Sequence, residues 1–215
     1  MPSYGTVDHD YGMRLATCDP AADGAIYMLN LMKYRDEAHY GPDGHGGVSG
    51  READDRYAPF DVLAAIGAAV CFTADVLEAS EDWDRVGVVR YPTRRAFIEM
   101  QSRQDFQEKH VHKEAGMDHT IVMTTLPVAA LPGKAKPRRI LLEVWAGDAP
   151  PSVGAERATT SDVATFAVEG TIVGDGRAWS GARYTTLDTD ADVRLAGATP
   201  AHQVLLLQPV IDRWT

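Results

Sequence analysis

Apolar runs of strand length alternate with helix-like stretches in the first half of the chain. The strand-length runs are residues 25–35, 68–79, 83–92 and 119–127. Between them, residues 51–67 and 93–117 place apolar side chains at the spacing of amphipathic helices. Strand, helix, strand, strand, helix, strand is the order of a ferredoxin-like βαββαβ unit, an α+β fold with both helices on one face of an antiparallel sheet. We therefore expect such a unit over residues 25–127.

A change of composition separates this unit from the rest of the chain. Residues 126–139 contain three prolines, one glycine and a basic cluster, which predicts a linker at 128–138. The runs beyond it predict strands at 139–146, 161–174, 182–191 and 201–211 and a short helix at 190–197. This order repeats that of the first half with shortened helices. The sequence thus predicts a second, degenerate ferredoxin-like repeat over 139–215, and a polar N-terminal arm at 1–24.

Composition limits the possible partners. The 215 residues, 45% of them hydrophobic and 24% charged, suffice for one large or two small domains. A formal net charge of −10 disfavours nucleic acid and anionic membrane surfaces, so small molecules and other proteins remain. No apolar run approaches the roughly 20 residues of a membrane-spanning helix, and no signal-peptide pattern begins the chain, so we expect a cytoplasmic protein. Cys18 lies in a polar arm and Cys71 in an apolar run, which argues against a disulfide framework.

Four blocks in the first half carry a family resemblance. They are MLNLMKY at 28–34, SGREADDRY at 49–57, WDRVGVVRYPTRRAFIEM at 83–100 and HKEAGM at 112–117. In this order and spacing they resemble a bacterial family of unknown function in the dimeric α/β-barrel superfamily. Its members look like M-L-N-L-L-K-F, S-G-R-E-A-Y-x-x-Y, W-D-x-V-x-x-V-x-Y-P-S-R-x-A-F and H-R-x-A-G-L. The resemblance covers nearly half of the chain.

The resemblance implies a ferredoxin-like unit whose sheet pairs with a second sheet to form a barrel. It implies no single reaction, because the wider superfamily includes cofactor-free monooxygenases acting on aromatic polyketides, muconolactone isomerases, haem enzymes and plain ligand binders. The chain departs from the family pattern at Lys113, where arginine is usual, and in its whole C-terminal half. That half could supply the second sheet, so we expect either a homodimer or an intramolecular pseudo-dimer.

The resemblance places a pocket between the sheet and the two helices, where polar side chains amid apolar ones are candidates for chemistry. Asn30 interrupts the apolar run of the first strand and shares a face with Met28, Met32 and Tyr34, because strand side chains alternate. Two interpretations of Asn30 stay open. It is either a buried amide bonded to a neighbouring backbone group or a donor to a substrate carbonyl or developing oxyanion.

Three histidines, His110, His112 and His119, fall in or just after the second helical stretch. His110 and His112 are two residues apart, about 200° around a helix axis, so they cannot jointly bind one metal ion. Glu108 with His112 and His110 with Glu114 have four-residue spacing, and such a carboxylate–imidazole pair suits acid–base catalysis. Only His112 falls on the family motif. His112 is therefore the first candidate proton carrier and His110 the second, with ordinary solvated or capping histidines as the alternative.

Tyr57 completes the candidate catalytic set. It lies on the apolar face of the first helical stretch, where core packing is the alternative, and its hydroxyl could contact a ligand. Arg90, near a strand end, could anchor an anionic substrate. The candidate substrate-binding residues are Met28, Met32, Tyr34, Arg90, Phe97 and Met100.

A glycine-rich segment at 36–50 follows the first strand and fits either a mobile lid over a pocket or a surface insertion. His39, Asp43 and His45 within it show no recognised metal-ligand spacing, and its glycines match no phosphate-binding pattern. We therefore expect no metal and no cofactor.

Sequence motifs for several reactions are missing, namely G-x-S-x-G, H-E-x-x-H, C-x-x-C and the kinase set. The resemblance favours an enzyme that uses the pocket for cofactor-independent acid–base chemistry on a small apolar molecule, such as isomerisation, cyclisation or elimination. Three alternatives stay open. One is a cofactor-free monooxygenase acting on an electron-rich substrate, the second is a non-catalytic small-molecule-binding or regulatory protein, and the third is a haem or metal protein.

Overall fold

Strands dominate the architecture of the chain. The computed structural model describes residues 4–41, 47–128, 131, 139–150, 163–187, 195 and 198–214. The described strands are β1 (Thr6–Val7), β2 (Ile26–Tyr34), β3 (Ala69–Ala79), β4 (Arg85–Tyr91), β5 (Met117–Pro127), β6 (Arg139–Trp145), β7 (Val163–Gly174), β8 (Gly181–Leu187) and β9 (His202–Asp212). The described helices are α1 (His9–Ala16), α2 (Gly50–Tyr57), α3 (Phe60–Ala65), α4 (Arg94–Gln101) and α5 (Gln104–Gly116).

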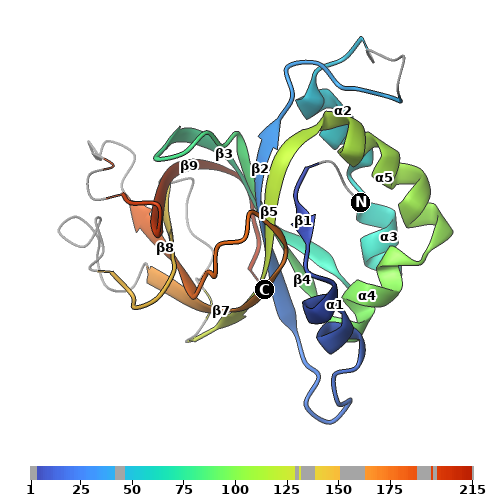
Figure 1. Cartoon of the computed structure of the whole chain (residues 1–215), viewed down its shortest axis with the longest axis horizontal. Coiled ribbons are helices and arrows are strands. Elements are labelled where there is room, and N and C mark those ends of the chain that lie inside the picture. The colour runs from blue at the N-terminus through green and yellow to red at the C-terminus, as the bar shows by residue number, and fades with distance from the viewer. Residues whose placement is uncertain are drawn as a thin grey trace.

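These strands form one antiparallel sheet that closes on itself. The strand order is β1-β7-β5-β2-β4-β3-β9-β6-β8, and β7 also pairs with β8. That last pairing runs from Val163 opposite Thr185 to Ala167 opposite Gly181, so eight strands form a ring, and β1 is an extra strand beside β7. Figure 1 shows the ring as a barrel with the helices on one side of it. Closure gives each strand of the ring two neighbours and so removes open sheet edges.

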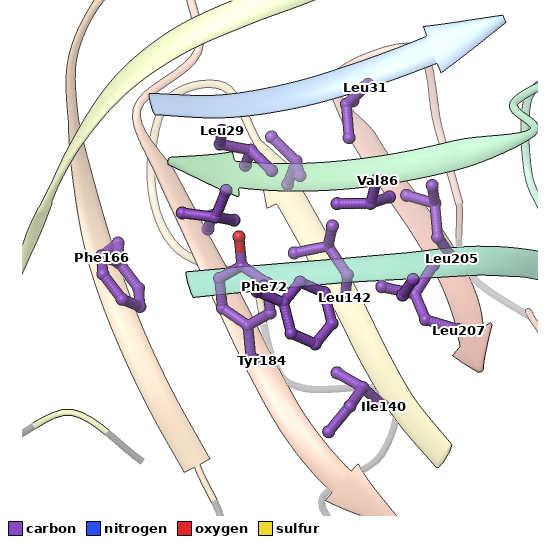
Figure 2. Packing of buried hydrophobic residues seen from close by; sticks show 14 of the residues in the cluster. Leu29, Leu31, Phe72, Val86, Ile140, Leu142, Phe166, Tyr184, Leu205 and Leu207 are labelled. Carbon is purple, nitrogen blue, oxygen red and sulfur yellow. The ribbon is translucent and has the colours of Figure 1, made fainter. Parts of the chain in front are cut away.

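Aromatic and aliphatic side chains fill the inside of the barrel. Phe72 is fully buried and stacks on Trp214 with ring centroids 5.2 Å apart, and Tyr184 packs edge-on against Phe72 at 5.8 Å. Figure 2 shows Phe72, Tyr184 and Phe166 among aliphatic side chains of the same cluster, including Leu29, Leu31, Leu142, Leu205 and Leu207. These residues come from both halves of the chain, so burial of apolar surface joins the halves in one core.

Strand β2 is buried on both of its faces. Leu29 and Leu31 belong to the core inside the barrel, whereas Met28 belongs to a second core beneath the helices. Double burial explains why the sequence of β2 is a nearly unbroken apolar run. The helices cover the outer face of the sheet (Figure 1). Their apolar sides supply Leu15, Val62, Leu63, Phe97, Met100 and Phe106 to the second core.

Most expected strands and helices form close to their predicted bounds. The expected helix at 51–67 is divided into α2 and α3 at Ala58 and Pro59, because a residue before proline is disfavoured in helical conformation. The expected helix at 93–117 is likewise divided into α4 and α5. The strands expected in the second half correspond to β6, β7, β8 and β9. The domain boundaries themselves stay a prediction.

The ferredoxin-like fold class is wrong for this chain. The structure is a closed antiparallel barrel of eight strands with helices on one side, in place of a ferredoxin-like α+β unit followed by a degenerate copy. The expected dimeric α/β-barrel architecture and the tandem repeat are wrong for the same reason. The two halves share one sheet, in which β3 pairs with β9 and β5 pairs with β7. Alternation of apolar residues predicts that strands form, but it does not determine which strands pair.

The N-terminal residues expected to be a polar arm form β1 and α1. The Asp8 carboxylate caps α1 by accepting a hydrogen bond from the Tyr11 backbone N–H at 2.8 Å. Tyr11 and Leu15 are the buried residues of the helix. Gly170 of β7 permits the close approach, since a Cβ atom there would lie 2.5 Å from the Tyr11 ring.

Two expected segments fall largely outside the described residues. They are the linker at 128–138 and the short helix at 190–197. In the part of the chain that is described, no helix has both the length and the apolar character needed to cross a membrane.

Replacing Phe72 by alanine tests the role of the aromatic stack in the barrel. We expect Phe72→Ala to lower the free energy of unfolding by about 3–5 kcal/mol, because its neighbours cannot fill the space of a buried ring. Leu77→Ala is the matched control, since Leu77 lies on the same strand and is 50% exposed. We expect the control to change the free energy of unfolding by less than about 0.5 kcal/mol. Urea unfolding measures both values, and an equally small effect of the two substitutions would contradict the packing described above.

Candidate functional site

A cavity of about 820 Å³ lies between the helices and the outer face of the sheet, and this volume is typical of small-molecule sites. Its wall is largely apolar and includes Met28, Leu63, Val89, Phe97, Met100 and Val122. Polar residues also line it, and four of them, Tyr4, Tyr57, His110 and Lys113, form what we call the polar cluster. The cavity therefore suits a molecule with an apolar body and a polar group.

The residues of the polar cluster are in mutual contact or close to it. The Tyr4 hydroxyl and His110 Nε2 form a hydrogen bond of 3.1 Å. The rings of Tyr57 and His110 lie edge to face with their centroids 6.1 Å apart. Lys113 Nζ lies 5.4 Å from the centre of the Tyr57 ring. One ligand group could thus reach several of these side chains.

Helical periodicity places two members of the polar cluster on one face of α5. Residues three and four apart are neighbours on a helix, and Phe106, His110 and Lys113 follow this spacing and line the cavity. Tyr57 is the last residue of α2. The start of that helix is fixed by a capping box, in which Ser49 and Glu52 each accept a hydrogen bond from the backbone N–H of the other.

Helices α2 and α5 meet at two glycines. Gly50 begins α2 and Gly116 ends α5, and a Cβ atom on either would lie 2.4 Å from the carbonyl oxygen of the other. The backbone of Arg35 joins the contact, since its N–H donates to the Gly116 carbonyl at 2.9 Å and its carbonyl accepts from the Gly50 N–H at 3.1 Å. The contact fixes the two helices relative to each other, and with them Tyr57 and Lys113.

Burial controls the protonation of His110. Its Nδ1 atom is buried and has no hydrogen-bond partner among the described residues. Desolvation, with a further contribution from the charge of Lys113, lowers the pKa of His110 below its ordinary value of 6.5. The imidazole is therefore neutral at pH 7. Burial also raises the pKa of the Tyr4 hydroxyl, so Tyr4 keeps its proton and can donate to Nε2 or accept from it.

Lys113 is buried without a paired charge. The residue is 8% exposed, and within the described ranges no hydrogen bond or ion pair involves its Nζ atom. A fully buried, unpaired lysine is rare in proteins. Burial lowers the pKa of Lys113, and the charge of Asp54 opposes this shift. Burial thereby disfavours the ammonium ion relative to that of an exposed lysine.

Asp54 is paired with groups other than Lys113. The Tyr34 hydroxyl donates a hydrogen bond to Asp54 Oδ2 at 2.6 Å. Arg85 Nη1 lies 3.3 Å from the same oxygen and 2.8 Å from an oxygen of Asp55. The carboxylate of Asp54 therefore already has a cation and a donor beside it.

The structure brings most of the sequence-predicted site residues together. Those that line the cavity are Asn30, Tyr57, His110, Met28, Met32, Phe97 and Met100. His112 is not among the lining residues, and its Nδ1 forms a hydrogen bond of 2.8 Å with the Tyr40 hydroxyl. Arg90 lies two residues after Val88 on β4, so it shares the barrel side of the strand with Val86 and Val88. The catalytic and binding roles of the predicted residues stay predictions.

Sequence analysis does not single out Tyr4 or Lys113 as site residues. The three-and-four spacing of Phe106, His110 and Lys113 on one helix is a signal that identifies Lys113 in retrospect. Tyr4 carries no such signal, because its position depends on a distant segment. The Thr120 N–H of β5 donates to the Tyr4 carbonyl at 2.9 Å and holds the N-terminal residues at the cavity.

The glycine-rich segment at 36–50 is described only in part. Asp43 and His45, considered above as metal ligands, lie outside the described residues. Among the residues that the structure covers, no three histidine, cysteine, aspartate or glutamate side chains group closely enough to hold a metal ion.

Comparison with known proteins supports similarity to a solved structure over part of the chain. A structure of methylated RPA0582 is 25% identical, covers 62% of this chain and 100% of its own, and has a TM-score of 0.52. A second structure, of RPA0582 from Rhodopseudomonas palustris, a protein of unknown function, is 26% identical, covers 57% of this chain and 95% of its own, and has a TM-score of 0.47. A proposed monooxygenase from Lactobacillus acidophilus is 9% identical, covers 86% of this chain and 94% of its own, and has a TM-score of 0.42.

No protein-family model matches the chain, and no protein of curated function matches it. The resemblance to a bacterial family of unknown function therefore stays a prediction. The similarity to RPA0582 carries no activity with it, because the function of that protein is itself unknown.

Replacing Lys113 by methionine tests whether its amine is buried without a charged partner. Because the pKa of Lys113 is lower in the folded than in the unfolded state, the unfolded chain binds more protons between the folded-state pKa and the unfolded-state value of ~10.4, and wild-type stability rises with pH across that interval. We expect Lys113→Met to raise the free energy of unfolding at pH 7 by about 1–2 kcal/mol, with a smaller gain at pH 10. Lys109→Met, on the same helix, is the control and should change little. Urea unfolding at both pH values measures this, and a destabilised Lys113→Met protein at pH 7 would argue against an unpaired amine.

Proposed function

We propose that the chain is an enzyme that binds a small, largely apolar molecule in the cavity and moves a proton on it without a cofactor, with His110 as the proton carrier. The observation that carries this proposal is the state of the His110 ring. The imidazole lines the cavity, Nε2 is bound to the Tyr4 hydroxyl, and Nδ1 has no partner among the described residues. Isomerisation, cyclisation and elimination all need such a group.

The Tyr4 hydroxyl supports both protonation states of the ring. When Tyr4 accepts a hydrogen bond from Nε2–H, Nδ1 carries the lone pair and acts as a base. When Nδ1 has taken a proton, the imidazolium still donates from Nε2 to the Tyr4 oxygen. The lowered pKa of His110 keeps the base form populated at neutral pH and below. Tyr4 is thus a positioning residue that remains bound throughout the proton transfer.

Tyr57 and Asn30 are suited to hold the oxygen on which charge develops. Burial raises the pKa of the Tyr57 hydroxyl well above its ordinary value, so it remains a donor, and no hydrogen bond from it to a described residue is formed. Asn30 Nδ2 donates to the Met28 carbonyl at 3.0 Å, which fixes the amide beside the cavity and leaves its second N–H available. Donors placed before the reaction stabilise an enolate-like oxygen more than the neutral carbonyl.

The ring opening of a nitrobenzisoxazole tests the proposed base, because this chromogenic reaction begins with removal of one proton from carbon. We expect His110→Gln to lower kcat/KM by about a hundredfold. The wild-type rate should stay high below pH 6.5, because a base with a lowered pKa remains unprotonated there.

Two further variants make this test specific. His119→Gln is the control, because His119 is an exposed residue packed on Trp83. His112→Gln separates the two histidines that the sequence suggests, and we expect it to keep the wild-type rate within about twofold. Equal rates for the wild type and His110→Gln would exclude His110 as the base. Binding of the probe without catalysis by any form would indicate a ligand-binding protein.

A further inference from the structure

We propose that Lys113 captures carbonyl compounds, forming an imine between its Nζ atom and the carbonyl carbon of an aldehyde or ketone held in the cavity. The inference rests on the proposed function, since it places the ligand in the same cavity, but it assigns the substrate class through a different residue. Two lysines of the chain, Lys33 and Lys113, differ in their surroundings.

Lys33 is a lysine with ordinary surroundings, because carboxylates pair with its charge. Its Nζ lies 2.8 Å from an Asp82 oxygen and 3.3 Å from an Asp84 oxygen, and the pKa of Lys33 is raised by these carboxylates. Lys113 has no such partner among the described residues, is only 8% exposed, and has its Nζ 5.4 Å from the centre of the Tyr57 ring. Lysine that is desolvated in an apolar site is the form that reacts with carbonyl carbon.

The charged and titratable groups around Lys113 do not compensate an ammonium ion. From α2 come Asp54, which Tyr34 and Arg85 already bind, and the neutral phenol of Tyr57. From the N-terminal residues comes Tyr4, also neutral. On α5 itself, His110 is neutral and Glu114 is exposed to solvent. The lowered pKa of Lys113 agrees with this geometry.

These surroundings favour a neutral carbonyl ligand over a carboxylate. A carboxylate would require the ammonium form of Lys113 and would place another negative charge in a cavity that Asp54 and Asp55 already line, which is costly without full pairing. An aldehyde or ketone brings no charge, and its apolar body fits against side chains such as Met28, Phe97 and Met100. The oxygen of such a ligand would accept a hydrogen bond from Tyr57.

The chemical step is balanced without an oxidant or reductant. The Nζ lone pair attacks the carbonyl carbon and forms a C–N bond, while the C=O π electrons move to oxygen; the oxygen takes up one proton and the nitrogen loses one, which gives a neutral carbinolamine. The oxygen then takes up a second proton, the C–O bond breaks and water leaves, while the nitrogen loses its second proton and the C=N bond forms. His110, one turn before Lys113 on α5, is placed to take and return the proton. The sum is amine plus carbonyl giving imine plus water.

Trapping with benzaldehyde and sodium cyanoborohydride at pH 7 tests this on the intact protein. The reagent reduces an imine to a stable benzyl amine, which peptide mass spectrometry locates. The chain has five lysines, Lys33, Lys109, Lys113, Lys134 and Lys136. An ordinary lysine is neutral only in roughly one molecule in a few thousand at this pH, so we expect Lys113 to be labelled at least about tenfold faster than Lys109 on the same helix.

Two controls tie the labelling to the cavity. Lys113→Arg should lose the fast label and keep the slow ones, and benzyl alcohol, which has no carbonyl, should slow labelling at Lys113 and leave Lys109 unchanged. Even labelling of Lys33, Lys109 and Lys113 in the wild type would overturn the inference, and this result needs no variant to fold. Even labelling of the lysines together with a His110-dependent rate on the nitrobenzisoxazole would contradict only the imine. Selective labelling of Lys113 together with a nitrobenzisoxazole rate that does not depend on His110 would contradict only the proposed proton transfer.

Discussion

Closure of the sheet is the constraint on which the rest of the structure depends. Strand β7 pairs with β5 along one part and with β8 along another, and β9 pairs with the opposite edge strand, β3. Because strands of the second half cover the barrel side of the first four, that side becomes a packed core around Phe72 and Trp214. The helices are left with the outer face alone (Figure 1), and the ligand space forms there and not inside the barrel.

Two groups of the site lower the stability of the fold, and the core formed by sheet closure offsets this loss. A buried imidazole nitrogen without a partner and a buried lysine without a counter-ion both oppose folding. A large apolar core shared by two halves of the chain supplies stability that offsets such groups. Polar groups of this kind persist where they serve binding or catalysis, which is why the polar cluster and not the apolar wall indicates the chemistry.

Sequence reasoning located the elements and much of the cavity but not the fold. The strands and helices of the first half were predictable because their apolar spacing is regular. Asn30 and Tyr57 were predictable as polar residues on otherwise apolar faces, and His110 as a histidine four residues from Glu114. The pairing of β3 with β9 was not, because hydrogen-bond partners far apart in the sequence leave no mark in local periodicity. Ranking histidines by the family motif favoured His112, whereas the cavity is lined by His110. Tyr4 also lines the cavity, and its position there follows only from the order of the strands in space.

The glycine contact between α2 and α5 changes what the family resemblance can mean. Gly50 and Gly116 belong to two of the four blocks that carry the resemblance, and each blocks the other from having a side chain. Any chain that has both glycines can hold these two helices at the same separation, whatever side chains lie between them. The pair of glycines is therefore a property of the scaffold and carries no information about the reaction.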